Sequence, residues 1–377
     1  MNFSGTTELI SLFLIVLLVY LLQCIYWVTP SPTRSAAFAL NRRGRGKRRY
    51  QGFVWNAFDT AGILANPLPP LSPMVVAQWP AFELSQDAIQ FRKKGAEEQE
   101  PVSISWEKLT VSSSESKLLC NGMLAFKGSE VQVREYAALL GRLQSARRAQ
   151  RAQIIQDWLR NAMSAQAAAR RVKVFSGRSL WLRIVANLEF FFLFLLAPLA
   201  FYRFGSGILW RMALILAVLS ITVVLEFWTL HKTLLPEGSD VRLKSAVTNL
   251  LSPMAAIRAS DVVSRDLLAG CHPLAAAGAV LDEDEFRAFA EEQLRLCRFG
   301  DYLDKTYQAA LQKAMERALT QKKLNPQELL RPPDPDPGCV VYCPRCLAQY
   351  TKAREECSDC GYEALEELAR VAVSKSS

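Results

Sequence analysis

Histidine is scarce in this chain, and the familiar catalytic motifs are missing. Only two histidines, His231 and His272, occur among the 377 residues. The sequence has no Walker loop, no G-x-S-x-G elbow, no H-E-x-x-H pair and no dinucleotide-binding glycine fingerprint. These absences remove the usual signatures of nucleotide hydrolysis, serine-dependent acyl transfer, zinc proteolysis and nicotinamide chemistry. They favour a protein that is not an enzyme, although an unfamiliar active site leaves no motif.

Charged residues are absent from one long apolar run near the start of the chain. Leu9–Val28 contains no Asp, Glu, Lys or Arg, and a helix of that length matches the bilayer core of about 30 Å. The run is longer than the apolar core of a signal peptide and no small-x-small cleavage site follows closely, so we expect an uncleaved anchor. Leu180–Tyr202 and Ile208–Leu230, separated by a short turn, predict a helical hairpin and bring the count to three transmembrane helices.

Basic residues predict the orientation of these helices. None precedes Leu9, whereas seven follow the first run within residues 29–50. They are Arg34, Arg42, Arg43, Arg45, Lys47, Arg48 and Arg49. The positive-inside rule then places residues 1–8 outside and every large region, including the C-terminus, in the cytosol. We expect a multi-pass protein of the cell membrane, and the compact loops and alanine-rich helices suggest a bacterial source.

The net charge of +9 has the same explanation. Much of the basic excess lies beside the apolar runs, where anionic headgroups attract it, so the expected partner is the lipid bilayer. Nucleic-acid binding is disfavoured, because neither an aromatic platform nor a recognisable helix-turn-helix accompanies the basic run. A protein partner or self-association through the long basic helix described below is expected instead.

Four cysteines near the C-terminus carry the most specific signal. Cys343, Cys346, Cys357 and Cys360 form two C-x-x-C pairs separated by ten residues, which is the spacing of a four-thiolate zinc site. In a reducing cytosol, cysteines are free thiols or ligands rather than disulfides. Redox cycling of the pairs and a mononuclear iron site remain alternatives, and Cys339 is interpreted as a packed or idle thiol.

The segments C-P-R-C and C-S-D-C-G resemble the two knuckles of the zinc-ribbon or rubredoxin-knuckle family, over residues 339–365. The resemblance implies a structural zinc held by the four thiolates and closed to water. Family glycines commonly follow the second cysteine of each knuckle. Gly361 does so, but Leu347 stands at the equivalent place in the first knuckle, which puts the geometry of that turn in question.

Between these features we expect an α+β, multi-domain organisation. Residues 51–128 read as a small antiparallel β-rich region, in which Asn121-Gly122 between two apolar runs predicts a hairpin. Ser129 can cap one long basic helix over residues 129–172. Residues 231–330 read as a helical cytosolic region, and the proline-rich residues 331–338 as a semi-rigid linker to the zinc ribbon.

We therefore expect an external N-terminus at residues 1–8, a transmembrane helix at 9–28, a basic tether at 29–50, the β-rich region at 51–128 and the long basic helix at 129–172. Transmembrane helices at 180–202 and 208–230 follow, and then the helical region at 231–330, the linker at 331–338 and the zinc ribbon at 339–365.

Charged residues inside the apolar hairpin are further candidates. With the turn near Gly205, Glu226 falls opposite Arg183 close to the cytosolic interface, so we predict a structural ion pair. Glu189 lies deeper and is a possible intramembrane polar site, for proton handling or contact with another subunit. A neutral Glu189 that merely faces another helix is the simpler alternative.

Two other polar groups favour structural roles. The acidic run that begins at Asp282 is interpreted as the first turn of a helix, and Cys271-His272 as a turn before Pro273. Taken together, these features predict a membrane-anchored cytosolic scaffold or regulator whose zinc ribbon serves protein interaction. The alternative is a membrane enzyme or sensor acting at the cytosolic face.

Overall fold

The computed structural model describes Ser11, Leu14 and residues 51–55, 75–92, 101–114, 116–235, 263–361 and 364–368. The predicted first membrane span and the basic tether therefore lie outside the described residues, apart from Ser11 and Leu14. The chain divides into two compact units. Unit 1 comprises residues 1–34, 54–76 and 170–268, and unit 2 comprises residues 35–53, 77–169 and 269–377.

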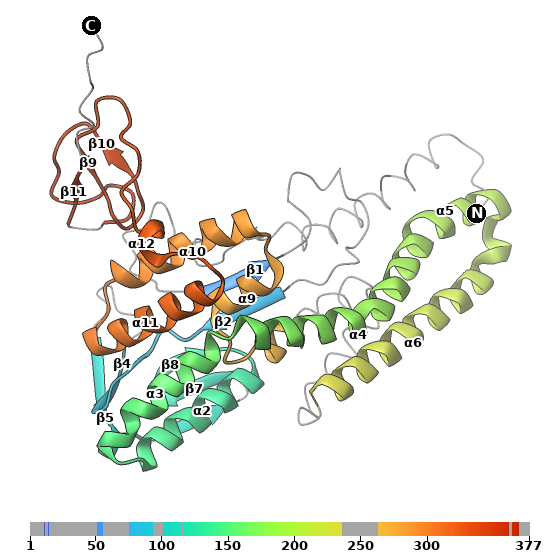
Figure 1. Cartoon of the computed structure of the whole chain (residues 1–377). Helices are drawn as coiled ribbons and strands as arrows, with labels where there is room; N and C mark the ends of the chain where they lie inside the picture. The colour runs from blue at the N-terminus through green and yellow to red at the C-terminus, as the bar shows by residue number, and fades with distance from the viewer. Residues whose placement is uncertain are drawn as a thin grey trace, which may run out of the picture. The chain divides into compact units, whose positions relative to one another are not determined.

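Small antiparallel sheets occupy the N-terminal half of the chain, as the sequence predicts (Figure 1). Their strands are β1 (Gln51–Trp55), β2 (Val75–Trp79), β3 (Glu83–Leu84), β4 (Ala88–Arg92), β5 (Pro101–Ser105), β6 (Val111–Ser114), β7 (Lys117–Cys120) and β8 (Met123–Lys127). β1 pairs with β2, and the other two sheets have the orders β3-β4-β5 and β6-β7-β8. The 3-10 helix η2 (Trp106–Lys108) separates the last two sheets and buries Trp106.

The hairpin between β7 and β8 confirms the Asn-Gly turn prediction. Asn121 and Gly122 adopt φ values of 51° and 77°, the left-handed conformation that a two-residue hairpin turn requires and that these residue types tolerate. The predicted cap at Ser129 is also present. Its hydroxyl accepts a hydrogen bond from the Gln132 N–H, while the Gln132 side chain accepts one from the Ser129 N–H.

The single long helix expected over residues 129–172 is wrong. Three helices replace it: α2 (Glu130–Ser145), α3 (Arg148–Ala162) and α4 (Ala165–Phe191). The chain turns at Ala146 and Arg147, where buried Arg151 donates hydrogen bonds to the Leu143 and Gln86 carbonyls. These tertiary bonds hold the reversal, and α2 packs on β6 and β7 instead of continuing.

Helices α9 (Pro273–Val280), α10 (Glu283–Arg298), α11 (Lys305–Gln321) and α12 (Pro326–Leu329) form the C-terminal part of unit 2. Asp282 caps α10 by accepting a hydrogen bond from the Glu285 N–H, as its acidic start predicts. His272 caps α9, with Pro273 in the first turn, so the Cys271-His272 pair belongs to a helix start.

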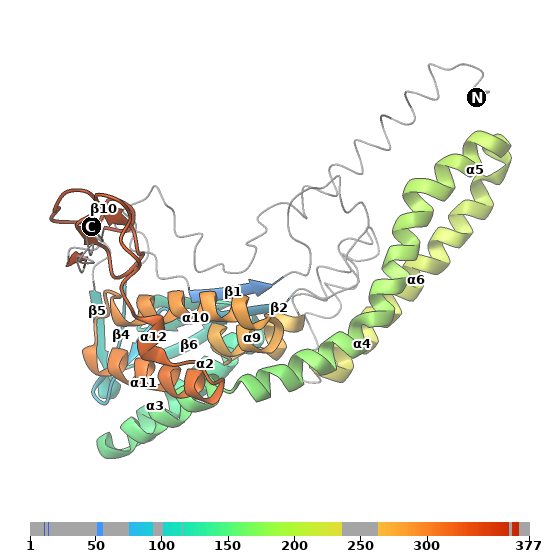
Figure 2. The same ribbon diagram turned by 45° about the horizontal axis from the view of Figure 1, so that its top comes forward.

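Unit 2 joins regions that the sequence suggested were separate. The Glu83 carboxylate on β3 accepts hydrogen bonds from the Leu303 and Asp304 N–H groups at 3.1 and 2.8 Å. The His272 N–H donates to the Ala162 carbonyl at 2.9 Å, and α3 packs against α11. The β-rich region and the helical region after the apolar hairpin are thus one folded body (Figure 2).

Unit 1 contains the apolar hairpin. α4 continues through a π-helical turn, η3 (Phe192–Leu196), into α5 (Ala197–Phe204), and the 3-10 turn η4 (Gly205–Ile208) leads back into α6 (Leu209–Leu234). Gly205 reverses the chain with a φ of 66°. Leu182 and Ala186 of α4 pack against Val223 and Phe227 of α6, so the two arms run antiparallel (Figure 2).

The hairpin is apolar outside as well as inside. Within the described residues, Ala165–Leu234 is the one helical segment long and apolar enough to span a membrane. Large apolar side chains are exposed along both arms from Leu180 to Trp228. Trp181 and Trp210 are each 64% exposed, at opposite ends of the hairpin. Such an apolar surface is unusual for a helix pair in water.

The Glu83 carboxylate generates a stability prediction for unit 2. Replacing Glu83 with Gln leaves one of two part-buried N–H groups facing an amide NH₂, so we expect the free energy of unfolding to fall by about 1–3 kcal/mol. Glu356→Gln is the control, because Glu356 is exposed and lies outside this contact. Denaturant unfolding of the two variants checks this, and equal losses would contradict the joining role of Glu83.

His272 predicts a pH dependence. Burial lowers its pKa from 6.5 to about 3, and its Nδ1 accepts the Leu274 N–H, so the folded state holds the ring neutral. The unfolded state binds the extra proton below pH 6.5, and stability is therefore lost as the pH falls from about 6.5 toward 3.

His272→Asn keeps a capping side chain but removes this titration. We expect its unfolding free energy to fall less steeply between pH 6 and 4 than that of the wild type, by on the order of 1 kcal/mol per pH unit. Denaturant titrations at several pH values measure both slopes. Identical slopes would refute the burial of a neutral ring.

Candidate metal centre

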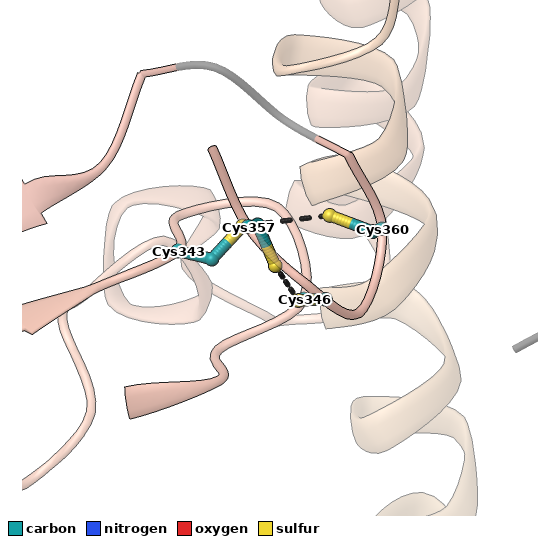
Figure 3. A group of neighbouring side chains, drawn as sticks. All are labelled: Cys343, Cys346, Cys357 and Cys360. Carbon is teal, nitrogen blue, oxygen red and sulfur yellow. Dashed lines mark hydrogen bonds between the residues drawn. The ribbon is translucent and has the colours of Figure 1, made fainter. Parts of the chain in front are cut away.

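The structure gathers the four predicted cysteines into one cluster (Figure 3). All four sulfur atoms of Cys343, Cys346, Cys357 and Cys360 lie within 4.8 Å of one another. The Cys343 and Cys360 sulfurs are 3.6 Å apart, and those of Cys346 and Cys357 are 3.4 Å apart. Four sulfurs placed about 2.3 Å from one centre would be separated by roughly 3.8 Å, so the cluster fits a tetrahedral metal ion. The four thiols can bind a metal.

Both knuckles have the same backbone. Leu347 N–H donates to the Cys343 carbonyl at 2.8 Å, and Gly361 N–H donates to the Cys357 carbonyl at 2.8 Å. Leu347 has a φ of 63° and Gly361 a φ of 65°. The leucine therefore does not change the turn. It adopts the left-handed conformation at a cost of roughly 1–2 kcal/mol, and the ligand geometry overrides that local preference.

Neighbouring groups favour a thiolate at Cys343, whereas their hydrogen bonds with Cys343 raise the pKa of the Cys346 and Cys360 thiols. Hydrogen bonds from Cys346 and then Cys360 hold the pKa of the Cys343 thiol far below its usual value. The Tyr350 hydroxyl lies 3.0 Å from the Cys357 sulfur, and the Ser358 hydroxyl donates to the Tyr350 oxygen at 3.3 Å. A hydroxyl that donates to a ligand thiolate orients it and disperses its charge, which is the usual role of groups around a metal centre.

Three short strands frame the cluster: β9 (Val341–Tyr342), β10 (Gln349–Tyr350) and β11 (Glu366–Glu367), in the antiparallel order β10-β9-β11. The module therefore extends past the expected end at residue 365. Tyr342 donates a 2.5 Å hydrogen bond to Glu366 across β9 and β11, and its burial and this bond raise its pKa to about 12.

The proline-rich linker does not leave the module free. Asp336 N–H donates to the Gln349 side chain, which in turn donates to the Asp334 carbonyl, both at 2.8 Å. Arg295 of α10 donates to the Pro344 carbonyl inside the first knuckle at 3.2 Å and to the Arg331 carbonyl at 2.5 Å. Its side chain is only 3% exposed. The four-cysteine module is thus docked on α10, and the spacer interpretation needs this correction.

The polar residues of the hairpin occupy α4 and α6. Glu189 is 2% exposed, and its Oε1 accepts a 2.5 Å hydrogen bond from the Ser220 hydroxyl. Its buried Oε2 has no hydrogen-bond partner in the described part of the chain. Arg183 is fully buried and Glu226 is half-buried. No salt bridge between these two side chains is present among the described residues, so their pairing stays a prediction.

Sequence reasoning missed two residues around the cluster. Tyr350 lies between the cysteine pairs, and its position there was the available signal. Arg295 lies 48 positions before Cys343 and carries no local signal, because only the packing of α10 against the knuckle reveals it.

Comparison with known proteins finds no match: no protein-family model, no curated protein and no solved structure matches the chain.

The two knuckle turns generate a matched pair of predictions. Leu347→Gly removes the left-handed strain and should raise the unfolding free energy of the metal-loaded protein by about 1 kcal/mol, less the entropy cost of a glycine. Gly361→Ala introduces the same strain and should lower it by about 1 kcal/mol. Thermal unfolding checks both variants. Destabilisation by Leu347→Gly would show that leucine packing outweighs the strain.

Proposed function

We propose that this protein is a membrane-anchored cytosolic scaffold or regulator, whose four-cysteine module holds a structural zinc and serves protein interaction. The observation that carries the proposal is the metal cluster docked by Arg295 onto a unit whose two chain halves flank an apolar hairpin. In this proposal the four-cysteine module is a closed, non-catalytic metal site, and the apolar hairpin is the membrane anchor.

Zinc is the proposed ion because of the donor set. Four thiolates in a tetrahedral arrangement suit zinc or iron, and they leave no position open for water. No thioredoxin-like strand-helix-strand surrounds either pair among the described residues, which supports a structural metal over redox cycling. A metal that joins two knuckles supplies folding free energy to a module with only short strands.

Exposed aromatic side chains support the membrane anchor. Trp181 and Tyr202 are 21 positions apart on one arm, about 32 Å of helix, and Trp210 and Trp228 are 18 positions apart on the other, about 27 Å. Both spacings approach the roughly 30 Å of a bilayer core, and exposed aromatic residues concentrate at its two interfaces. We propose two spans here, and Leu9–Val28 as a third.

The fold also supports the proposed orientation. Residues 77–169 precede the hairpin in the sequence and residues 269–377 follow it, and both segments belong to unit 2. One folded body cannot straddle a bilayer, so an even number of crossings must separate the two parts. A two-span hairpin satisfies that requirement. The basic residues flanking the hairpin, Arg178 and Lys232 among them, favour the cytosolic side.

A membrane enzyme or sensor is the second candidate, and Glu189 is the observation that favours it. A carboxyl with one buried oxygen unpartnered is costly in an apolar surrounding, and such residues often mark functional sites. Glu189→Gln would preserve the shape and the bond with Ser220. Unchanged assembly and activity in that variant would remove this candidate.

Loss of the metal gives the test of the leading proposal. We expect one zinc ion per chain by elemental analysis, and a loss of most of it in Cys357→Ser. Hydrogen exchange at residues 339–361 should then accelerate strongly, while the protein stays in the membrane fraction. Cys339→Ser is the matched control, because Cys339 lies outside the cluster. Slow exchange of the metal-free module would contradict a structural zinc.

Capture of partners from membranes tests the interaction role. A defined protein retained by the wild type and by Cys339→Ser, but lost with Cys357→Ser, is the expected result. Identical partners for all three proteins would overturn the role of the module and direct attention to the β-rich region.

A further inference from the structure

An apolar hollow lies at the turn end of the hairpin, where α5, η4 and α6 meet. Its volume is about 470 Å³, within the range of small-molecule sites, and its lining is almost wholly apolar. The lining residues are Phe192, Leu196, Leu199, Ala200, Arg203, Phe204, Ile208, Arg211, Met212 and Ile215. All of them belong to unit 1, and α5 and the start of α6 lie side by side in both ribbon views (Figures 1 and 2).

Local backbone features account for the hollow. The π-helical turn at Phe192–Leu196 widens α4 directly before Pro198, which lacks the N–H that a regular helix would use there. In the turn next to the hollow, Gly205 and Gly207 have no side chain, and a Cβ atom at either position would meet nothing within 4 Å.

Two exposed arginines lie among the residues that line this apolar hollow. Arg203 and Arg211 both line it, and no acidic residue lies between Glu189 and Glu226 in the sequence. Neither arginine takes part in a salt bridge or a hydrogen bond within the described residues, and the guanidinium of Arg211 lies 5.4 Å from the Trp210 ring. Both arginine side chains are exposed, so an anionic group held beside the apolar lining can reach their guanidinium groups.

We propose that the hollow binds one anionic phospholipid, with an acyl chain on the apolar lining and the phosphate on Arg203 and Arg211. Guanidinium groups recognise phosphate oxygens through paired hydrogen bonds, and a lipid presents its phosphate directly above its acyl chains. Exposed Trp210 and Tyr202 belong at that headgroup level. The inference rests on the proposed membrane anchoring of the hairpin.

Competition between two lipids tests the site. The full chain, purified in a neutral detergent, is mixed with equal amounts of phosphatidylglycerol and phosphatidylcholine carrying the same acyl chains. Native mass spectrometry then counts each lipid on the intact protein. The wild type should retain phosphatidylglycerol in excess. The double variant Arg203→Gln, Arg211→Gln should lose that preference by roughly fivefold per arginine, or about 25-fold in total.

Two further variants separate charge from shape. Ala200→Phe fills the hollow and leaves both arginines, so retention of phosphatidylglycerol should fall. The double variant Lys173→Gln, Arg178→Gln removes two exposed basic residues of α4 away from the hollow, and it should keep the wild-type preference. Equal loss in this control would show a general charge effect and overturn the site.

Other occupants give other results. Inorganic phosphate at millimolar concentration should not displace the lipid, and displacement would mean a phosphate site without an acyl chain. A hollow filled by Leu9–Val28 or by a second copy of the chain would show no lipid preference in the wild type, which also overturns the proposal. Extraction of membranes with alkaline carbonate tells the two proposals apart. Release of the protein refutes membrane anchoring, whereas retention without lipid preference refutes only the lipid site.

Discussion

The return of the chain to one folded body after the apolar hairpin is the constraint on which the rest of this structure depends. Residues 77–169 and 269–377 fold together as unit 2. The Glu83 carboxylate of the first segment accepts hydrogen bonds from two N–H groups of the second. The two arms of the hairpin are antiparallel, so the chain that leaves unit 2 through α4 returns through α6 toward the end at which it left.

The metal cluster shows a similar coupling on a smaller scale. Two C-x-x-C turns supply the ligands locally, and β9, β10 and β11 are too short to hold the module without them. Arg295 then connects the first knuckle to α10, since its guanidinium binds carbonyls of Pro344 and Arg331. A charge this deeply buried is tolerable because its donors are paired. The first knuckle and the helical part of unit 2 thus share the contacts of Arg295.

Local signals in the sequence predicted local structure well. Asn121-Gly122 fixed a hairpin turn and Ser129 a helix cap, because each acts on the backbone within a few residues. Predictions failed where contacts with distant residues outweighed the local preference of the chain. The helix after Ser129 ends before Ala146, although the composition of residues 129–172 suits a helix throughout. Arg151 holds the break, because it donates hydrogen bonds to carbonyl groups across the turn. Leu347 carries no turn signal, yet it adopts the same left-handed conformation as Gly361 in the other knuckle.

The sequence by itself determined the clustering of the four cysteines, the apolar arms of the hairpin, the Asn121-Gly122 turn and the caps at Ser129 and Asp282. It could do so because thiol spacing, hydropathy and capping act over short stretches of chain. Only the tertiary structure decided that the β-rich and helical regions are one unit, that the metal module is docked, and that Arg203 and Arg211 border a hollow. Those outcomes depend on contacts between residues distant along the chain or on opposite arms of a turn, whose free energies no local pattern records.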